Sequence, residues 1–201
     1  EKTSFSRPTL IVAEDVTAIA TGAWHSLFLK ADGSLWSMGS NAHGRLGDGT
    51  IEDRNSPTLV VDRGVVAIAG GFSHSLFVNE DGSLWGMGLD DTGQLGLPGN
   101  DKRLTPVEII PSGVRSCSAG NKSSYFVKTD GSLWVMGRND SGQLGVGSTS
   151  HKYNPFMVIA SGVDSVSSYS HHVLVVNDDG SLHTFGRNNN GQLGDGSTSN
   201  S

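Results

Sequence analysis

Histidine is the residue type in this chain that most readily acts as a general base or a metal ligand near neutral pH. His25 and His74 stand 49 residues apart, and the next two positions at the same step are Ser123 and His172. A residue that recurs once per repeat is distributed over the molecule, so these positions are not expected to converge on one site. We therefore predict buried imidazoles that hydrogen-bond backbone groups at the starts of strands, and no catalytic residue.

The single cysteine, Cys117, excludes an internal disulfide and a cysteine-based metal site. Its counterparts at the same 49-residue step are the apolar residues Ile19, Ile68 and Val166. A cysteine in an apolar place is buried and reacts slowly. We therefore expect an inert thiol in the core.

Acidic and glycine-rich segments are the remaining candidates for ligand chemistry. The turn 177–180, Asn-Asp-Asp-Gly, lacks the spaced ligands and the distal Glu of a calcium loop. The loop 44–49 carries three glycines but lacks the Gly-x-x-x-x-Gly-Lys-Ser/Thr pattern and a following helix, which a phosphate site requires. The sequence therefore predicts no metal and no cofactor.

The elements that position these residues repeat four times. Asp-Gly-Ser-Leu-Trp begins at Asp32 and returns at steps of 49 residues, with His in place of Trp in the last copy. A Gly-Gln/Arg-Leu-Gly segment and a proline return at the same step. We predict one repeat domain over 1–201, in which residues 1–7 share the phase of the inter-unit loop. Its units are 8–56, 57–105, 106–154 and 155–201.

Each unit contains four short apolar runs and a long loop. In the first unit, an Asp-Gly pair separates the last two runs, which is a strong signal for a hairpin turn. No segment keeps a helical period. Four antiparallel strands repeated every 40 to 50 residues are typical of a β-propeller blade, so we predict an all-β propeller. The expected strands are Thr9–Val12, Val16–Thr21, His25–Lys30 and Ser34–Gly39, followed by the loop Ser40–Ser56.

The tryptophan that ends the repeated pentapeptide is expected to pack between blades. Large aromatic side chains bury much area, and Trp36, Trp85 and Trp134 recur at this place. His183 replaces the fourth tryptophan. A smaller polar residue there indicates a terminal or less covered blade.

Three motifs are similar to those of the regulator of chromosome condensation repeat family. They are Gly-x-x-His-Ser at 22–26 and 71–75, the Asp-Gly-Ser-Leu-Trp hairpin, and Gly-Gln-Leu-Gly. The resemblance covers residues 8–201 and implies a ring of about seven blades, of which this chain supplies four. It also implies, for some members, guanine-nucleotide exchange on a Ran-type GTPase. No exchange residue of the family matches a position in this sequence.

The four units leave open how the ring closes. The chain is expected to be part of a larger ring, but a complete small ring and an assembly of two chains are alternatives. In a complete ring, Thr9–Val12 supplies the missing outer strand of the last unit. An open arc of four units exposes sheet edges, which favours association.

Function is expected where the repeat breaks, in two loops of each unit that emerge on one face of the ring. The short loop follows the second expected strand, and the long loop follows the fourth. Aromatic and basic residues in these loops are typical of protein interfaces. The alternative is that the loops vary because nothing constrains them. The expected partner-binding residues are Trp24, Arg54, Phe72, Lys102, Arg103, Lys122, Lys152, Tyr153 and His171.

These features favour a non-catalytic module that binds a protein partner. The alternatives are an exchange factor for a small Ran-type GTPase and a propeller-type enzyme inhibitor. The net charge of −6 argues against direct nucleic-acid binding, and no run of 18 apolar residues indicates a membrane span. The chain starts without Met or a signal-type stretch, which suggests processing or excision from something longer. Few cysteines suit both a cytoplasmic and an extracellular location.

Overall fold

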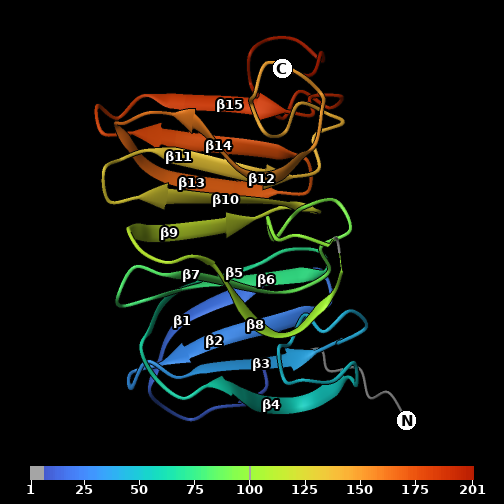
Figure 1. The fold of residues 1–201 in the computed structure, drawn as a ribbon, viewed down its shortest axis with the longest axis vertical. Coiled ribbons are helices and arrows are strands. Elements are labelled where there is room, and N and C mark those ends of the chain that lie inside the picture. The colour runs from blue at the N-terminus through green and yellow to red at the C-terminus, as the bar shows by residue number, and fades with distance from the viewer. Residues whose placement is uncertain (1–6, 100) are drawn as a thin grey trace.

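The computed structural model describes residues 7–99 and 101–201, which form four antiparallel sheets (Figure 1). No helix occurs in these residues, and so none could cross a membrane. The first sheet is β1 (Val16–Thr21), β2 (His25–Lys30), β3 (Leu35–Gly39) and β4 (Arg54–Val61). The second is β5 (Val65–Gly70), β6 (His74–Asn79), β7 (Leu84–Gly88) and β8 (Arg103–Ile110). The third is β9 (Val114–Ala119), β10 (Ser123–Lys128), β11 (Leu133–Gly137) and β12 (Lys152–Ile159), and the last is β13 (Val163–Tyr169), β14 (His172–Asn177) and β15 (Leu182–Gly186).

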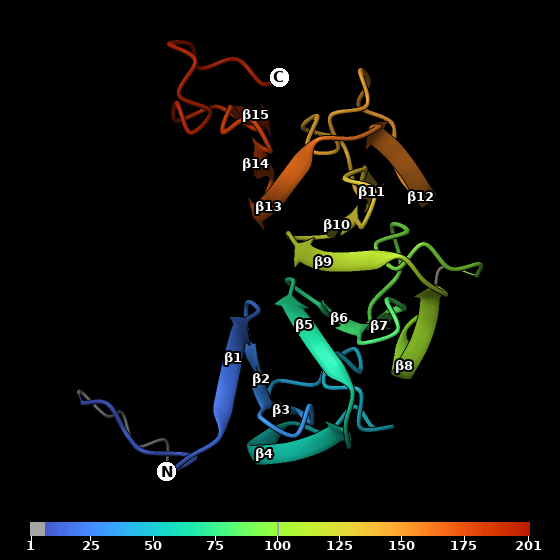
Figure 2. The ribbon, with the colours of Figure 1, turned by 90° about the vertical axis from the view of Figure 1, so that its left-hand side faces the viewer.

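The sheets stand side by side as blades of an open arc (Figure 2). Strands β1, β5, β9 and β13 form the concave side and contact one another from sheet to sheet. Strands β4, β8 and β12 lie on the outside. This arrangement confirms the predicted blades and is consistent with part of a larger ring.

The fourth strand of each complete sheet begins at the end of its own sequence unit and continues into the next unit. Residues 54–61 pair with β3 of the first sheet, with Leu35 opposite Val61. The expected strand Thr9–Val12 is wrong, because these residues form no strand in the structure. An extended segment becomes a strand only beside a pairing edge, and the arc offers none there. Residues 1–6 of the expected inter-unit phase lie outside the described residues.

The cores lie between neighbouring sheets. The ring of Phe77 stacks on Trp85 with centroids 6.2 Å apart, and both pack on the leucines of the first sheet. Phe126 and Trp134 repeat this stack between the second and third sheets. Packing between blades is therefore confirmed for Trp85 and Trp134. Trp36 stacks on Phe28 in the same way, but it lines an open hollow on the first sheet and no other described sheet covers it. His183 lies in the three-stranded last sheet and is exposed. This agrees with the prediction that the replacement of tryptophan by histidine marks a terminal or less covered blade.

The Asp-Gly hairpins form the uniform edge of the arc. Asp32 Oδ1 accepts a hydrogen bond of 2.9 Å from the backbone N–H of Ser34, and the same bond occurs in the other three hairpins. Gly33 has a φ of 77°, which glycine adopts without steric cost. Bonds from Ser34 lower the pKa of Asp32.

The recurring histidines bridge neighbouring blades. His25 Nε2 lies 2.7 Å from Ser75 Oγ, and the Ser75 hydroxyl donates to the carbonyl of Arg45. The hydroxyl proton is thus engaged, so Nε2 must carry the proton and Nδ1 is bare. Burial, with Arg45 nearby, lowers the pKa of His25 to about 4. Burial of these imidazoles is confirmed for His25 and His74, but the predicted backbone partner is wrong, because a serine hydroxyl of the next blade takes that place.

The long loops fold around one buried side chain. Asn139 Oδ1 accepts from the backbone N–H of Leu144 at 2.8 Å, and its Nδ2 donates to the carbonyl of Ser148 at 2.7 Å. Asn41 and Asn188 make the corresponding bonds in their loops. The second sheet has Asp90 at this place.

Candidate functional site

Both variable loop sets emerge on one edge of the arc. His25 at the start of β2 lies opposite Gly39 at the end of β3, and Gly39 lies opposite Arg54 at the start of β4. The short β1–β2 turn and the long β3–β4 loop therefore meet, and the backbone N–H of Ser40 donates to the carbonyl of Trp24 at 2.8 Å. We call this edge the loop edge.

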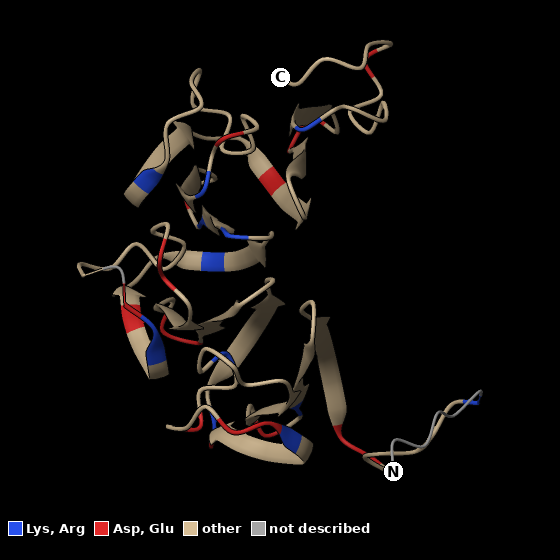
Figure 3. Cartoon of the chain, turned by 90° about the vertical axis from the view of Figure 1, so that its right-hand side faces the viewer, with Lys and Arg blue, Asp and Glu red and all other residues tan. Residues whose placement is uncertain are grey.

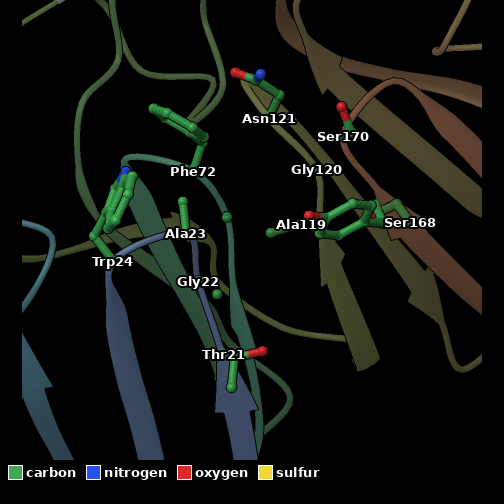
Figure 4. Close-up of a pocket in the computed structure, with 13 residues that line it drawn as sticks. Thr21, Gly22, Ala23, Trp24, Phe72, Ala119, Gly120, Asn121, Ser168 and Ser170 are labelled. Atoms are coloured by element: carbon green, nitrogen blue, oxygen red, sulfur yellow. The ribbon is translucent and has the colours of Figure 1, made fainter. Parts of the chain in front are cut away.

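A pocket of about 590 Å³ opens where the loop edge meets the concave side of the arc (Figure 4). It is formed by the ends of the inner strands and the turns that follow them, in all four sheets. We call it the central pocket. Its lining residues are Thr21, Gly22, Ala23, Trp24, Gly70, Gly71, Phe72, Ala119, Gly120, Asn121, Ser168, Tyr169 and Ser170.

Three exposed aromatic residues dominate the central pocket. Trp24 is 67% exposed, Phe72 is 42% exposed and Tyr169 is 78% exposed. They come from the first, second and fourth sheets. Figure 4 shows Trp24 and Phe72 side by side, with Asn121 and Ser170 across the opening. Aromatic side chains of this exposure give a partner large contact area at a low entropic cost.

Hydrogen bonds between neighbouring turns hold the floor of the pocket. The backbone N–H of Ala23 donates to the carbonyl of Gly71, and that of Phe72 donates to the carbonyl of Gly120 at 3.1 Å. The backbone N–H of Asn121 donates to the carbonyl of Ser170 at 2.9 Å. Each turn is thereby fixed to the next, so the aromatic side chains project from a rigid base.

Tyr169 was not among the predicted site residues. It stands at the repeat position of Gly22, Gly71 and Gly120. With a side chain there, β13 extends to Tyr169, which pairs with His172, and the turn shortens to Ser170 and His171. The loss of a repeated glycine in the last unit was the sequence signal for this residue.

The remaining short-loop residues lie next to the pocket but do not line it. Lys122 Nζ forms an ion pair of 2.6 Å with Asp91 Oδ2, which belongs to the long loop of the neighbouring sheet. His171 Nδ1 lies 2.8 Å from Ser170 Oγ. Burial, followed by the charge of Arg138, lowers the pKa of His171. These residues support the rim of the pocket.

The predicted long-loop residues lie away from the pocket, at or beside the starts of outer strands. Arg54 and Arg103 were expected in loops, but they begin β4 and β8; Lys152 and Tyr153 likewise begin β12. The backbone there pairs with the glycine that ends the preceding strand, so pairing continues further than the loop composition indicated. Lys102 is exposed just before β8.

Most of these outer residues already have a partner within the chain. Arg54 Nε pairs with Asp48 Oδ2 at 2.6 Å, and Arg103 donates to the carbonyl of Pro98 at 2.6 Å. The Lys152 ammonium lies 4.5 Å from the centre of the Phe156 ring. Their cations are thus partly compensated, which reduces what they offer to a partner.

Charge is spread over the arc. Figure 3 shows basic and acidic residues interspersed along the four sheets and their loops. None of the residues that line the central pocket is charged. The pocket therefore suits a neutral, partly apolar group with some hydrogen-bonding capacity.

The four radial sheets, their inter-sheet aromatic stacks and the single variable edge define a β-propeller repeat protein. Residues 1–201 match the family described as RCC1-like domain, and the chain belongs to that family. This confirms the resemblance seen in the repeated motifs.

Solved structures of the same fold are about twice as long as this chain. Human WBSCR16 matches with a TM-score of 0.80 at 25% identity, over 92% of this chain and 51% of that chain. Yeast RCC1 (Prp20) bound to Kap60 matches with a TM-score of 0.82 at 24% identity, over 96% and 48%. Prp20p from Saccharomyces cerevisiae, studied for its binding to Gsp1p and histones, matches with a TM-score of 0.80 at 23% identity, over 92% and 49%. No curated protein sequence matches.

Proposed function

We propose that this chain is a non-catalytic module that binds a protein partner through the central pocket and its rim. The observation that carries the proposal is the group of exposed aromatic residues Trp24, Phe72 and Tyr169 around one concave opening. Tryptophan and tyrosine are enriched among residues that dominate binding energy. Their position at breaks in an otherwise repeated frame supports a role in recognition.

The chemistry of the pocket indicates the kind of contact. Its uncharged lining favours a protruding segment with an apolar or aromatic tip, anchored by backbone hydrogen bonds to groups such as Asn121 and Ser170. The rigid base keeps the ordering cost of binding low. A charged tip would lose hydration without a countercharge.

The test compares substitutions inside and outside the pocket. Proteins captured from the source by the unaltered chain are identified, and the affinity of each is measured for Trp24→Ala and Phe72→Ala. Loss of a hot-spot side chain costs about 2 kcal/mol or more, which is roughly a 30-fold weaker affinity. Tyr153→Ala, a similarly exposed aromatic on β12, is the matched control and is expected to bind normally. Equal affinity of all three variants contradicts the proposal.

A second candidate is nucleotide exchange on a small GTPase. Prp20p, which has this fold, was studied for its binding to Gsp1p. The family resemblance implies, for some members, exchange on a Ran-type GTPase. An exchanger acts by coupling its own binding to release of the nucleotide. The measurement is release of a fluorescent guanine nucleotide from a Ran-type GTPase with and without the chain. Acceleration that Trp24→Ala abolishes supports exchange through the same pocket, and an unchanged release rate rejects it.

A further inference from the structure

The long loop of the first sheet breaks the repeat at a buried position. Arg45 stands where the other three long loops have a glutamine. The Oε1 of that glutamine accepts a hydrogen bond from a backbone N–H of its own loop, at 3.0 Å for Gln94, 2.8 Å for Gln143 and 2.9 Å for Gln192. Arginine has no acceptor and cannot make this bond. The first loop therefore lacks an internal bond, and the Arg45 side chain contacts a different part of the molecule.

The Arg45 side chain crosses to the next blade and reaches the turn that carries Phe72. Its Nη1 donates to the carbonyl of Phe72 at 3.1 Å. We propose that Arg45 is a positioning residue of the central pocket, which fixes the Phe72 turn to the first sheet and so sets how tightly the pocket binds its partner. This inference rests on the proposed function, in which Phe72 is one of the aromatic residues that contact the partner.

The two peptide groups of Phe72 are held from both neighbouring sheets. From the third sheet, the carbonyl of Gly120 accepts from the backbone N–H of Phe72 at 3.1 Å. From the first sheet, Arg45 donates to the carbonyl of Phe72. Because the Phe72 side chain is 42% exposed, these backbone contacts, more than packing of the ring, determine where the ring projects.

A buried arginine is unfavourable at this position. Arg45 is 4% exposed, forms no ion pair in the described part of the chain, and its Nε has no hydrogen-bond partner there. Burial lowers the pKa of Arg45, although the charge of Asp53 opposes this. A buried cation without an adjacent carboxylate reduces stability, whereas the glutamines of the other loops show that a neutral side chain fits the frame. Departures of this kind from the locally favoured residue are expected at functional sites.

The backbone of Arg45 is fixed independently of its side chain. Its carbonyl accepts from the Ser75 hydroxyl at 2.8 Å, within the bridge from His25. The carbonyl of Gln94 accepts from the Ser124 hydroxyl in the same way, at 2.6 Å. Glutamine at position 45 is therefore compatible with the frame. Arg45→Gln removes the contact with Phe72 and keeps the fold of the loop.

The next interface has a contact of different chemistry between the corresponding elements. Lys122, in the short turn of the third sheet, pairs with Asp91, in the long loop of the second sheet, at 2.6 Å. In both interfaces a charged side chain joins a long loop to the short turn that follows it, although the residues stand at different repeat positions. Both contacts hold a turn of the central pocket or its rim in place, which lowers the ordering cost of binding.

The first test needs no partner. Hydrogen exchange of backbone N–H groups is followed by NMR in the parent and in Arg45→Gln, and the free energy of unfolding is measured in urea. Loss of one hydrogen bond to the turn is expected to speed exchange at the N–H of Phe72 about fivefold. The N–H of Asn121, which donates to Ser170 one repeat later, keeps its rate, and the free energy of unfolding stays equal or rises. An unchanged rate at Phe72, or faster exchange at both N–H groups with a lower free energy of unfolding, overturns the proposal.

The second test is a double-mutant cycle on affinity. Partner proteins captured by the unaltered chain are measured against Arg45→Gln, Phe72→Ala and the double variant. We expect Arg45→Gln to weaken binding about fivefold at low and at high salt concentration, and to add nothing once Phe72 is replaced. Arg63→Gln removes an exposed arginine beside the Asp-Gly hairpin and is the matched control, which keeps the affinity of the parent. An effect of Arg45→Gln that disappears at high salt indicates attraction by charge and overturns the positioning role, as does an additive double variant.

The affinities also separate this inference from the proposed function. If Phe72→Ala leaves the affinity unchanged, the central pocket is not the binding site and both proposals fail. If Phe72→Ala weakens binding and Arg45→Gln does not, the pocket stands as the binding site and only the role of Arg45 is rejected.

Discussion

Asp90→Asn is expected to stabilise this protein in a pH-dependent manner. Asp90 is fully buried, and its Oδ1 accepts from the backbone N–H of Leu95 at 2.7 Å. Its Oδ2 has no partner in the described residues, whereas the Nδ2 of Asn139 at the same repeat position donates to a loop carbonyl. A buried carboxylate with one unpaired oxygen thus stands where the other three long loops hold the amide of an asparagine.

The magnitude follows from proton linkage. Burial raises the pKa of Asp90 from 3.8 to about 6, although the backbone N–H groups of Leu95 and Leu97 and the charge of Arg103 oppose the rise. Between these two values the unfolded chain is ionised while the folded chain keeps its proton, so stability falls as pH rises from about 4 to about 6. At about 1.4 kcal/mol for each pH unit, ionised Asp90 costs the fold about 3 kcal/mol at pH 8 relative to pH 4.

The assay is urea unfolding followed by tryptophan fluorescence at pH 4.5 and pH 8. Asp90→Asn is expected to raise the free energy of unfolding by about 2 to 3 kcal/mol at pH 8, and by much less at pH 4.5. The difference between variant and parent removes the titration of all other groups. Asn139→Asp is the reciprocal control and is expected to destabilise, most strongly at pH 8. An Asp90→Asn effect that is equal at both pH values, or that destabilises at pH 8, refutes the reasoning.

Two further predictions concern the histidine bridges. Gly71→Ala places a Cβ against the ring of His74, so we expect a loss of about 2 to 3 kcal/mol in the free energy of unfolding by urea. Gly113→Ala is the control: its Cβ meets no other atom, so we expect a loss of only about 1 kcal/mol, which comes from the positive φ of this residue. Burial lowers the pKa of His74 to about 3, so the unfolded chain takes up a proton as pH falls below 6.5 while the folded chain does not. The His74→Gln variant is therefore expected to lose less stability than the parent protein between pH 6.5 and pH 4. An equal loss of stability in variant and parent would contradict an uncharged His74 in the folded protein.

The 49-residue period made the frame predictable. The expected strands at 16–21 and 25–30 are those of the structure, because each lies between turn signals that repeat in phase. The strand at 9–12 was wrong for a physical reason. Local sequence gives a segment its extended tendency, but pairing needs a neighbouring edge, and periodicity alone does not say to which sheet an outer strand belongs.

The site was only partly predictable from loop composition. Trp24 and Phe72 line the central pocket, as exposed aromatic residues in variable turns indicated. Arg54 and Arg103 were chosen for their residue type, but both have internal partners that the sequence did not reveal. Whether a charge is available to a partner depends on tertiary contacts, which a repeat alignment within one chain does not specify.

A departure from the repeat at a structurally constrained position tells more about the binding surface than a departure in an unconstrained loop. At Gly22 and Gly71 a Cβ would overlap the neighbouring histidine ring, so a side chain there requires a different turn. The last unit makes that change at Tyr169, where Ser170 adopts a φ of 54° and the strand lengthens. The altered backbone directs an aromatic residue into the central pocket, which the three regular turns cannot do from that position. A substitution that changes the turn geometry thus adds a feature to the binding surface, whereas most of the variable cations of the outer strands contact their own chain.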